Sequence, residues 1–273
     1  MLLAINMYPF TLQFDNGLYA CFPFIFNKEP VVSIGNNSRS KNPAPSCLIS
    51  ERSAGDMVFR LAASNNKREE FFSFRGIPAE KVYSLYQIHS KNVFSLGQPQ
   101  SEDQGILPHP SDFAQEGDGM VSFSPFPILA ITVADCLPVF LLDTENGYFA
   151  LVHSGLKGTG IVLNALDIMQ KAGSRPEAIA AVLGPCIQGC CYKVDKERAV
   201  QFDKEFGAVR HEPSGSYISL QAANARLLTA RGVQHIAYCT DCTFCDERLG
   251  SFRREGPQSF TRMIAMISPA NYG

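Results

Sequence analysis

Runs of apolar, β-prone residues alternate along this chain with segments of helical periodicity. The predicted strands are rich in Val, Ile, Phe and Tyr and end at turn residues. They cover Leu18–Phe26, Lys81–His89, Ile128–Ala134, Val139–Asp143, Tyr148–Val152, Ala178–Leu183, His235–Cys239 and Phe260–Ile267. Apolar residues recur at helical spacing in Gly160–Ala172, Lys196–Phe206 and Ser219–Ala230. This alternation predicts a layered α/β (α+β) fold of mixed β-sheets flanked by helices.

Two neighbouring apolar runs predict an antiparallel hairpin. The segments VFLLD (139–143) and YFALV (148–152) flank a TENG turn. Pairing Asp143 with Tyr148 across that turn places His153 opposite Pro138. Cys136 is then the diagonal neighbour on the same face, at about 7 to 8 Å between Cα atoms. The register alone therefore brings a thiol and an imidazole together.

A third candidate ligand, His89, ends the strand-like run KVYSLYQIH. Nothing local places it beside the other two. Thiolate and imidazole ligands suit Zn²⁺, and three protein ligands leave one position free for water or substrate, which is typical of a catalytic zinc site. If His89, Cys136 and His153 converge, the chain is an enzyme.

The segment after His153, HSGLKGTG, leads directly into a predicted helix. Gly155, Gly158 and Gly160 permit a tight turn whose backbone N–H groups end at a helix N-terminus, and this arrangement suits an anion. The Walker A pattern is absent. An ordinary strand-to-helix turn is the alternative, but the contact with a candidate metal ligand favours phosphate.

The composition narrows the class of protein. With 273 residues the chain can bury a sizeable core, and we expect residues 1–273 to form a single domain. The net charge of −2 is spread along the sequence, which argues against binding of nucleic acid or an anionic membrane. The segments 35–46 and 97–117 are predicted loops. Without a secretory signal or a long apolar run, we expect a cytoplasmic protein that is a monomer or a small homo-oligomer.

Nine cysteines, an odd number, favour free thiols or metal ligands over a disulfide framework. Six of them crowd late in the chain, in GPCIQGCCY (Cys186, Cys190, Cys191) and in a CxxCxxC pattern (Cys239, Cys242, Cys245). The spacing allows a structural zinc or an iron–sulfur cluster with a remote fourth ligand. Small buried hydrophobic cysteines are the alternative interpretation.

Several motifs occur together in one order. These are QIHSKNV, GDGMVSFSPFPILAITVADCLPVFLLD, LVHSGLKG, LGPCIQGCCYKV and SFRREG, from Gln87 to Arg262. In this order they resemble the YfiH-type laccase-domain family, also called multicopper polyphenol oxidoreductases and now regarded as zinc-dependent purine nucleoside phosphorylases.

The resemblance implies one Zn²⁺ held by His89, Cys136 and His153. It also implies phosphorolysis of adenosine, inosine, guanosine or methylthioadenosine, and deamination of adenosine at the same site. Purine nucleosides and phosphate would be the partners. Carried over by motif, the catalytic residues are Asp135, Cys136 and His153, the substrate and phosphate residues are Gln87, Lys157, Arg253 and Arg262, and Asp118 comes from GDG.

This chain departs from the family at several positions. The family's HAGWRG reads HSGLKG, so Leu156 replaces an aromatic residue and Lys157 replaces an arginine that offers a planar fork to phosphate. The family's N-terminal TR-GG-S segment is not recognisable around residues 27–38, and Thr261 replaces a glycine. These changes predict weaker recognition of phosphate or purine.

The expected roles make structural demands. Asp135 can act beside Cys136 only if the strand bends, and Pro138 suggests such a bend. Lys157, the helix start and Arg262 would position phosphate, while Asp135 contacts the base. The alternative to a functional role for Arg253 and Arg254 is that they form a solvated charged loop. Tyr192, Phe244 and Phe252 are interpreted as packing residues rather than a purine stack.

Three other functions remain open. The five histidines (His89, His109, His153, His211, His235) are too few for a cluster of several coppers, although one Cu²⁺ at the trio could support weak laccase-like polyphenol oxidation. A cysteine hydrolase would use Cys136 as nucleophile and His153 as base. A binding module would use the metal ligands only to hold the fold.

Overall fold

The computed structural model describes residues 6–15, 17–26, 28–31, 45–59, 65–97 and 115–268. The α-helices are α1 (Asn66–Phe74), α2 (Ile161–Lys171), α3 (Lys196–Phe206), α4 (Leu220–Ala230) and α5 (Phe252–Glu255), with short 3-10 turns at Arg52–Ala54, Ala79–Lys81 and Pro176–Ala178. None of the helices in these ranges is both long and apolar enough to cross a membrane.

The described strands form two large sheets. The first has seven strands in the order β1 (Asn6–Phe10), β17 (His235–Cys239), β13 (Ile179–Leu183), β11 (Leu137–Asp143), β12 (Phe149–Ser154), β9 (Gly119–Ser122) and β8 (Val93–Leu96). The second has six, in the order β2 (Phe14–Asp15), β3 (Tyr19–Phe22), β6 (Ser46–Ser50), β18 (Met263–Ser268), β10 (Ile128–Val133) and β7 (Val82–Tyr83). Both contain parallel and antiparallel pairs.

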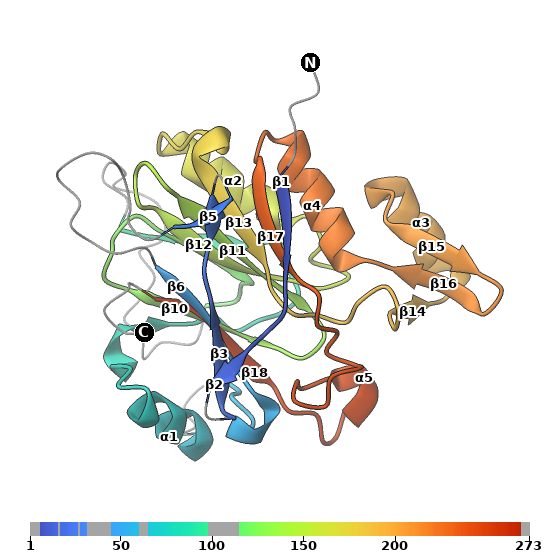
Figure 1. The fold of residues 1–273 in the computed structure, drawn as a ribbon, viewed down its shortest axis with the longest axis horizontal. Helices are drawn as coiled ribbons and strands as arrows, with labels where there is room; N and C mark the ends of the chain where they lie inside the picture. The colour runs from blue at the N-terminus through green and yellow to red at the C-terminus, as the bar shows by residue number, and fades with distance from the viewer. Residues whose placement is uncertain are drawn as a thin grey trace.

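Two small sheets complete the described strands. One pairs β4 (Ile25–Phe26) with β5 (Glu29–Pro30). The other joins β14 (Lys193–Val194), β16 (Gly215–Ile218) and β15 (Val209–Glu212), which lie beside α3 at one end of the molecule (Figure 1).

The two large sheets pack face to face, because alternate residues of each strand point to opposite faces. Phe140 and Leu142 of β11 meet Phe22 and Ile131 of the second sheet in one core. The opposite face of the seven-stranded sheet is covered by α2 and α4, and the outer face of the six-stranded sheet by α1 (Figure 1). The predicted class of mixed sheets flanked by helices is confirmed.

Local capping explains why two predicted helices have sharp ends. The Asp195 side chain accepts the Arg198 N–H at the start of α3, and Gly207 ends that helix in the left-handed conformation. The Ser219 side chain caps α4 in the same way by accepting the Ala222 N–H. The range predicted for α3 is confirmed, and the other two predicted helices lose only terminal residues.

The strand predictions were less accurate. The run predicted over Lys81–His89 is wrong beyond Val82–Tyr83, because the chain then leaves the sheet and makes only one isolated bridge, Tyr86 to Glu116. The prediction for Leu18–Phe26 splits into β3 and β4. Strand β6 and helix α1 were not predicted. The predicted loops 35–46 and 97–117, and residues 27–38, lie mostly outside the described residues.

Candidate active site

Cys136 lies where the chain crosses from one large sheet to the other. Strand β10 ends at Val133 and β11 begins at Leu137 in the other sheet. The required bend exists, but it lies at Asp135, whose φ is +85°, and not at Pro138, which sits inside β11. A side chain at this crossover is placed at the end of both sheets.

The predicted hairpin register is confirmed. Strands β11 and β12 are antiparallel, and Pro138 pairs with His153. The backbone N–H of Asp143 donates to the carbonyl oxygen of Tyr148 at 2.8 Å, which closes the turn as predicted. His153 therefore reaches the crossover that carries Cys136.

The third residue, His89, also arrives at this point. Its ligand atom and those of Cys136 and His153 all lie within 4.8 Å of one another. The rings of His89 and His153 are 4.9 Å apart between centroids and are inclined by 69°. The structure thus brings the whole predicted trio together.

A buried carboxylate, Asp118, holds both histidines. It accepts the backbone N–H groups of Ile88 (3.3 Å), His89 (3.0 Å) and Ser90 (2.6 Å), which fixes His89 at its unusual φ of +59°. Its Oδ1 also lies 2.9 Å from Nδ1 of His153. Because His153 Nδ1 donates to this carboxylate, Nε2 is left as the ligand atom.

The charges of the trio form a thiolate–imidazolium pair between Cys136 and His153, and a metal ion would displace the Nε2 proton of His153 on binding. Burial opposes ionisation of the Cys136 thiol, but the two imidazoles outweigh burial and lower its pKa to about 6. Burial also disfavours protonated His153, yet the Cys136 thiolate and Asp118 raise its pKa to about 9. Burial disfavours the Asp118 carboxylate as well, and hydrogen bonds from His153 and Ser90 still lower its pKa. Cys136 is therefore a thiolate at neutral pH, which is the form that binds metals.

The chain also leaves room for an ion at the trio. A Cβ atom at Gly155 would lie 2.7 Å from Sγ of Cys136 and 3.2 Å from Cδ2 of His89. Only glycine allows the backbone to pass so close to two of the ligands. The donor set of two imidazoles and one thiolate fits Zn²⁺ with one coordination position open.

Gly155→Ala is expected to weaken zinc binding about tenfold and to destabilise the fold by about 1 to 3 kcal/mol, because the new methyl group pushes Cys136 Sγ out of place. Titration with a zinc-buffering chelator measures the affinity. Gly76→Ala, just after α1, is the control, because its Cβ would meet nothing within 4 Å while its φ of +62° makes the substitution destabilising without any contact to the trio. Equal zinc affinity in the Gly155 variant and the wild type would show that the close approach of the Gly155 backbone to Cys136 and His89 is not needed for metal binding.

The trio opens into a cavity of about 1110 Å³. Gln87, Asp135, Lys157, Arg253 and Arg262, the remaining predicted site residues, all line it. The structure therefore gathers the predicted residues around one space, although their roles stay predictions. A cavity of this size holds a drug-sized ligand.

Gln87 and Asp135 already use their polar atoms within the protein. The Gln87 side chain accepts the Thr132 N–H (2.7 Å) and donates to the Thr132 oxygen (2.9 Å), so it replaces a missing strand at the edge of β10. The buried Asp135 carboxylate accepts the Thr243 hydroxyl and the Arg253 N–H, each at 2.7 Å. Both residues thus shape the cavity wall as well as facing the ligand space.

The cations of the cavity differ in how far they are neutralised. Arg262 pairs with Asp56 at 3.0 Å and lies over the Phe260 ring. Within the described parts of the chain, Lys157 and Arg253 form no ion pair with a carboxylate. Arg253 donates to the Lys193 carbonyl oxygen at 3.0 Å and lies over the Tyr192 ring, but its charge, like that of Lys157, is not neutralised by a carboxylate of the described residues and is available to an anionic ligand.

Two further cations that were not predicted also line the cavity. Lys91, two residues after His89, pairs with Glu205 at 3.7 Å, and Arg198 of α3 pairs with Asp195 at 3.3 Å. The signal for Lys91 was its place in the QIHSK motif. Arg198 arrives from a helix distant in sequence, so no local pattern indicated it.

The glycine turn places Lys157 at the cavity rim and ends in α2. Gly160 precedes the helix with φ of +97°. The Ile161 N–H already donates to the Gly158 oxygen, and the Leu163 N–H to the Gly160 oxygen, both at 3.0 Å. Fewer backbone donors than expected are free for an anion, and the anion pocket stays a prediction that rests mainly on Lys157.

The histidine positions bear on copper chemistry. His211 is exposed on β15 and forms a hydrogen bond with the Ser216 hydroxyl. His235 of β17 packs against Phe26 of β4. His109 lies outside the described residues. Of the four described histidines only two reach the trio, which does not supply the imidazoles for several coppers.

Comparison with known proteins agrees with the resemblance seen in the sequence. Residues 53–270 match the multi-copper polyphenol oxidoreductase laccase family. A protein of Corynebacterium glutamicum named purine nucleoside phosphorylase is 30% identical over 80% of this chain and 85% of its own length. A Deinococcus radiodurans protein of the same name is 31% identical over 87% and 83%.

Solved structures share the fold. The crystal structure of YlmD from Geobacillus stearothermophilus has a TM-score of 0.75 at 23% identity and covers 94% of this chain and 98% of that chain. The YfiH structure from Bacillus licheniformis, described as a hypothetical protein, has a TM-score of 0.69 at 24% identity and covers 82% and 92%. The match of the family model over residues 53–270 shows that the chain belongs to the multi-copper polyphenol oxidoreductase laccase family.

Proposed function

We propose that this chain is a zinc-dependent purine nucleoside phosphorylase that accepts adenosine, inosine, guanosine or methylthioadenosine and also deaminates adenosine at the same site. The observation that carries the proposal is the open cavity in which His89, Cys136 and His153 face Lys157 and Arg253. The names of the relatives supply the purine nucleoside and phosphate.

Aromatic side chains of the cavity suit a purine. Phe252 and Phe260 meet edge to face, with ring centroids 5.0 Å apart, and both line the cavity together with Tyr192. Phe252 is 45% exposed, so much of its surface is free for a ligand. We assign the purine to this wall, where stacking on an aromatic ring contributes about 1 to 3 kcal/mol per base. This revises the view of Tyr192 and Phe252 as packing residues only.

The phosphate is assigned to two cations of the cavity, of which Arg253 lies over the Tyr192 ring, 5.4 Å from its centroid. Lys157 and Arg253 would hold it against the ribose, since neither has a carboxylate partner among the described residues. Arg262, already paired with Asp56, keeps Phe260 in place and adds less charge. Holding the anion in line with the ribose carbon is the main catalytic contribution of these side chains.

Zinc held by the trio would supply Lewis acidity and lower the pKa of a bound water. Asp118 keeps Nε2 of His153 free for the ion by accepting the hydrogen bond of the Nδ1–H group. Asp135, fixed through Thr243 and Arg253, lines the cavity and would contact the base.

The direct test incubates the zinc-loaded protein with adenosine, inosine, guanosine and methylthioadenosine in turn, each with and without phosphate. Free base and ribose 1-phosphate should appear only with phosphate, and ammonia should appear from adenosine in both cases. Base release that is equally fast without phosphate would replace phosphorolysis with hydrolysis. A lack of turnover of all four nucleosides would overturn the proposal.

Lys157→Ala is expected to raise the KM for phosphate about tenfold, because one charge-assisted contact of about 1.5 kcal/mol is lost. Deamination consumes no phosphate and should fall far less. Lys157→Arg should keep or lower this KM, since arginine offers a planar fork. Lys171→Ala, at the far end of α2, is the control. An unchanged phosphate KM in Lys157→Ala would exclude the assignment.

The site also favours a cysteine hydrolase as a second candidate. Asp118, His153 and Cys136 lie in the order expected for an orienting acid, a base and a nucleophile, and the pKa of Cys136 is lowered. His89, within ligand distance of the other two, is not needed for that chemistry and favours zinc. Rapid alkylation of Cys136 by iodoacetamide in metal-containing protein would support the hydrolase.

A further inference from the structure

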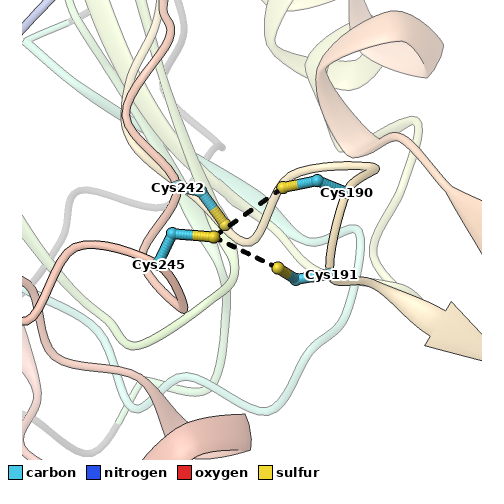
Figure 2. A group of neighbouring side chains, drawn as sticks. All are labelled: Cys190, Cys191, Cys242 and Cys245. Atoms are coloured by element: carbon cyan, nitrogen blue, oxygen red, sulfur yellow. Dashed lines mark hydrogen bonds between the residues drawn. The ribbon is translucent and has the colours of Figure 1, made fainter.

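Four cysteines gather outside the active-site trio. Cys190 and Cys191 follow β13, and Cys242 and Cys245 follow β17. These strands are parallel neighbours, so the loops after them leave the same edge of the sheet. An isolated parallel β-bridge between the backbones of Cys186 and Cys242, whose thiols are free, holds the loops together. Figure 2 shows the four side chains pointing toward one another from the two loops.

The spacing of the four sulfurs suits one tetrahedral ion. All lie within 4.8 Å of one another, with Cys191 and Cys245 at 3.3 Å and Cys190 and Cys245 at 4.0 Å. With Zn–S bonds of about 2.3 Å, the sulfurs of a tetrahedral zinc site are about 3.8 Å apart. An iron–sulfur cluster places several irons between its thiolates and needs a wider opening.

Hydrogen bonds order the turn that carries Cys242 and Cys245. The Gln188 N–H donates to Cys242 Sγ at 3.4 Å. The Arg254 guanidinium donates to the carbonyl oxygens of Thr243 (2.5 Å) and Phe244 (3.1 Å), within the same turn. These contacts fix the backbone of the turn, while the Arg254 charge is paired with Glu255 at 2.8 Å.

The other two late cysteines take no part. Cys186 and Cys239 are fully buried. The Cys239 thiol lies 3.5 Å from Asp241 Oδ2. The ligand pattern therefore takes two cysteines from each of the two motifs, which explains why neither motif alone supplies a complete site.

We propose that Cys190, Cys191, Cys242 and Cys245 bind a structural Zn²⁺ ion, distinct from the zinc of the active-site trio. The four soft ligands leave no position for substrate, which is typical of a structural site. On binding, each thiol that is still protonated releases its proton to solvent, and no electron is transferred.

This ion would stabilise the loops that build the candidate active site. Thr243, next to Cys242, donates its hydroxyl to Asp135. The Ile187 N–H donates to the Asp135 carbonyl oxygen at 3.0 Å. Tyr192, next to Cys191, lines the cavity. A tether between the two loops therefore fixes Asp135 and one cavity wall without touching substrate.

The test counts metal per chain in full-length protein purified with zinc. Cys191→Ser/Cys245→Ser should bind one zinc ion fewer than the wild type and keep the zinc of the trio. Cys136→Ala should lose the other ion and keep this one. Cys21→Ser, at an exposed thiol of β3, should lose none. Cobalt bound to Cys136→Ala should show the visible spectrum of tetrahedral thiolate ligation.

The wild type gives an independent measurement if the double variant does not fold. In native protein the four thiols should resist iodoacetamide until zinc is removed. A mass lower by the hydrogens of a Cys191–Cys245 disulfide, with no metal, would overturn the proposal, as would an unchanged zinc count in the folded double variant. Zinc lost from Cys191→Ser/Cys245→Ser but not from Cys136→Ala would contradict the trio's zinc and leave this site standing.

Discussion

Cys136→Ala should abolish zinc binding at the trio and lower kcat/KM for inosine by at least about 1000-fold, which corresponds to about 4 kcal/mol of transition-state stabilisation. The substitution removes the only thiolate of the trio and leaves two imidazoles, one of them exposed. Metal analysis and steady-state kinetics on the same preparation measure both effects.

The matched control is Cys21→Ala, which removes an exposed thiol outside both cysteine and histidine groups. It should keep wild-type zinc and activity. Removing zinc from the wild type with a chelator should reproduce the loss, and adding zinc back should restore turnover. Full activity in rigorously metal-free wild-type protein would refute a role for zinc in turnover.

The part of the site that depends on local sequence could be predicted. The register of β11 with β12 follows from a short turn and two apolar runs, and it places His153 beside the end that carries Cys136. Helix α3 has the predicted bounds because its caps, Asp195 and Gly207, are next to it in sequence. Such features need no information from distant segments.

His89 reaches the site by a route that local sequence does not reveal. The run before it has the apolar residues of a strand, yet the strand ends at Tyr83. Beyond it, the side chain of Gln87 bonds the backbone of Thr132 and replaces the backbone hydrogen bonds of a strand. The left-handed backbone of His89 is held by Asp118, 29 residues away. A strand was predicted because the periodicity of apolar residues carries no information about a contact with this distant carboxylate.

The four-cysteine group shows the same limit more strongly. CxxCxxC suggested that Cys239, Cys242 and Cys245 act together, but Cys239 lies within β17 and is buried in the core. The partners of Cys242 and Cys245 arrive through the parallel pairing of β13 with β17. Parallel strands are joined by long connections, so their loops meet only once the sheet has formed.

Asp135 connects the two candidate metal sites. It precedes Cys136 in the chain, and its carboxylate receives hydrogen bonds from Thr243 and from the Arg253 backbone. Thr243 follows a cysteine of the four-cysteine group, and Arg253 is one of the two unpaired cavity cations among the described residues. Movement of either loop therefore changes the position of Asp135 relative to the trio.

Asp118→Asn is expected to lower zinc affinity at the trio by about 10- to 100-fold, the usual effect of losing a hydrogen-bond partner behind a metal ligand. The buried Asp118 carboxylate accepts three backbone N–H groups, the Ser90 hydroxyl and the His153 ring. In asparagine an NH2 group replaces one of the acceptor oxygens, so some of these N–H and O–H groups lose their acceptor. We therefore also expect a loss of about 3 kcal/mol in the free energy of unfolding.

Asp143→Asn separates the effect on the metal from the effect on stability. Asp143 is equally buried and accepts the N–H groups of Glu145 and Asn146, but it lies at the far end of the β11–β12 hairpin. Its variant should lose stability in urea unfolding and keep the zinc affinity of the wild type. If both variants lose stability alike and Asp118→Asn binds zinc normally, Asp118 holds the fold and does not position His89 and His153 for the metal.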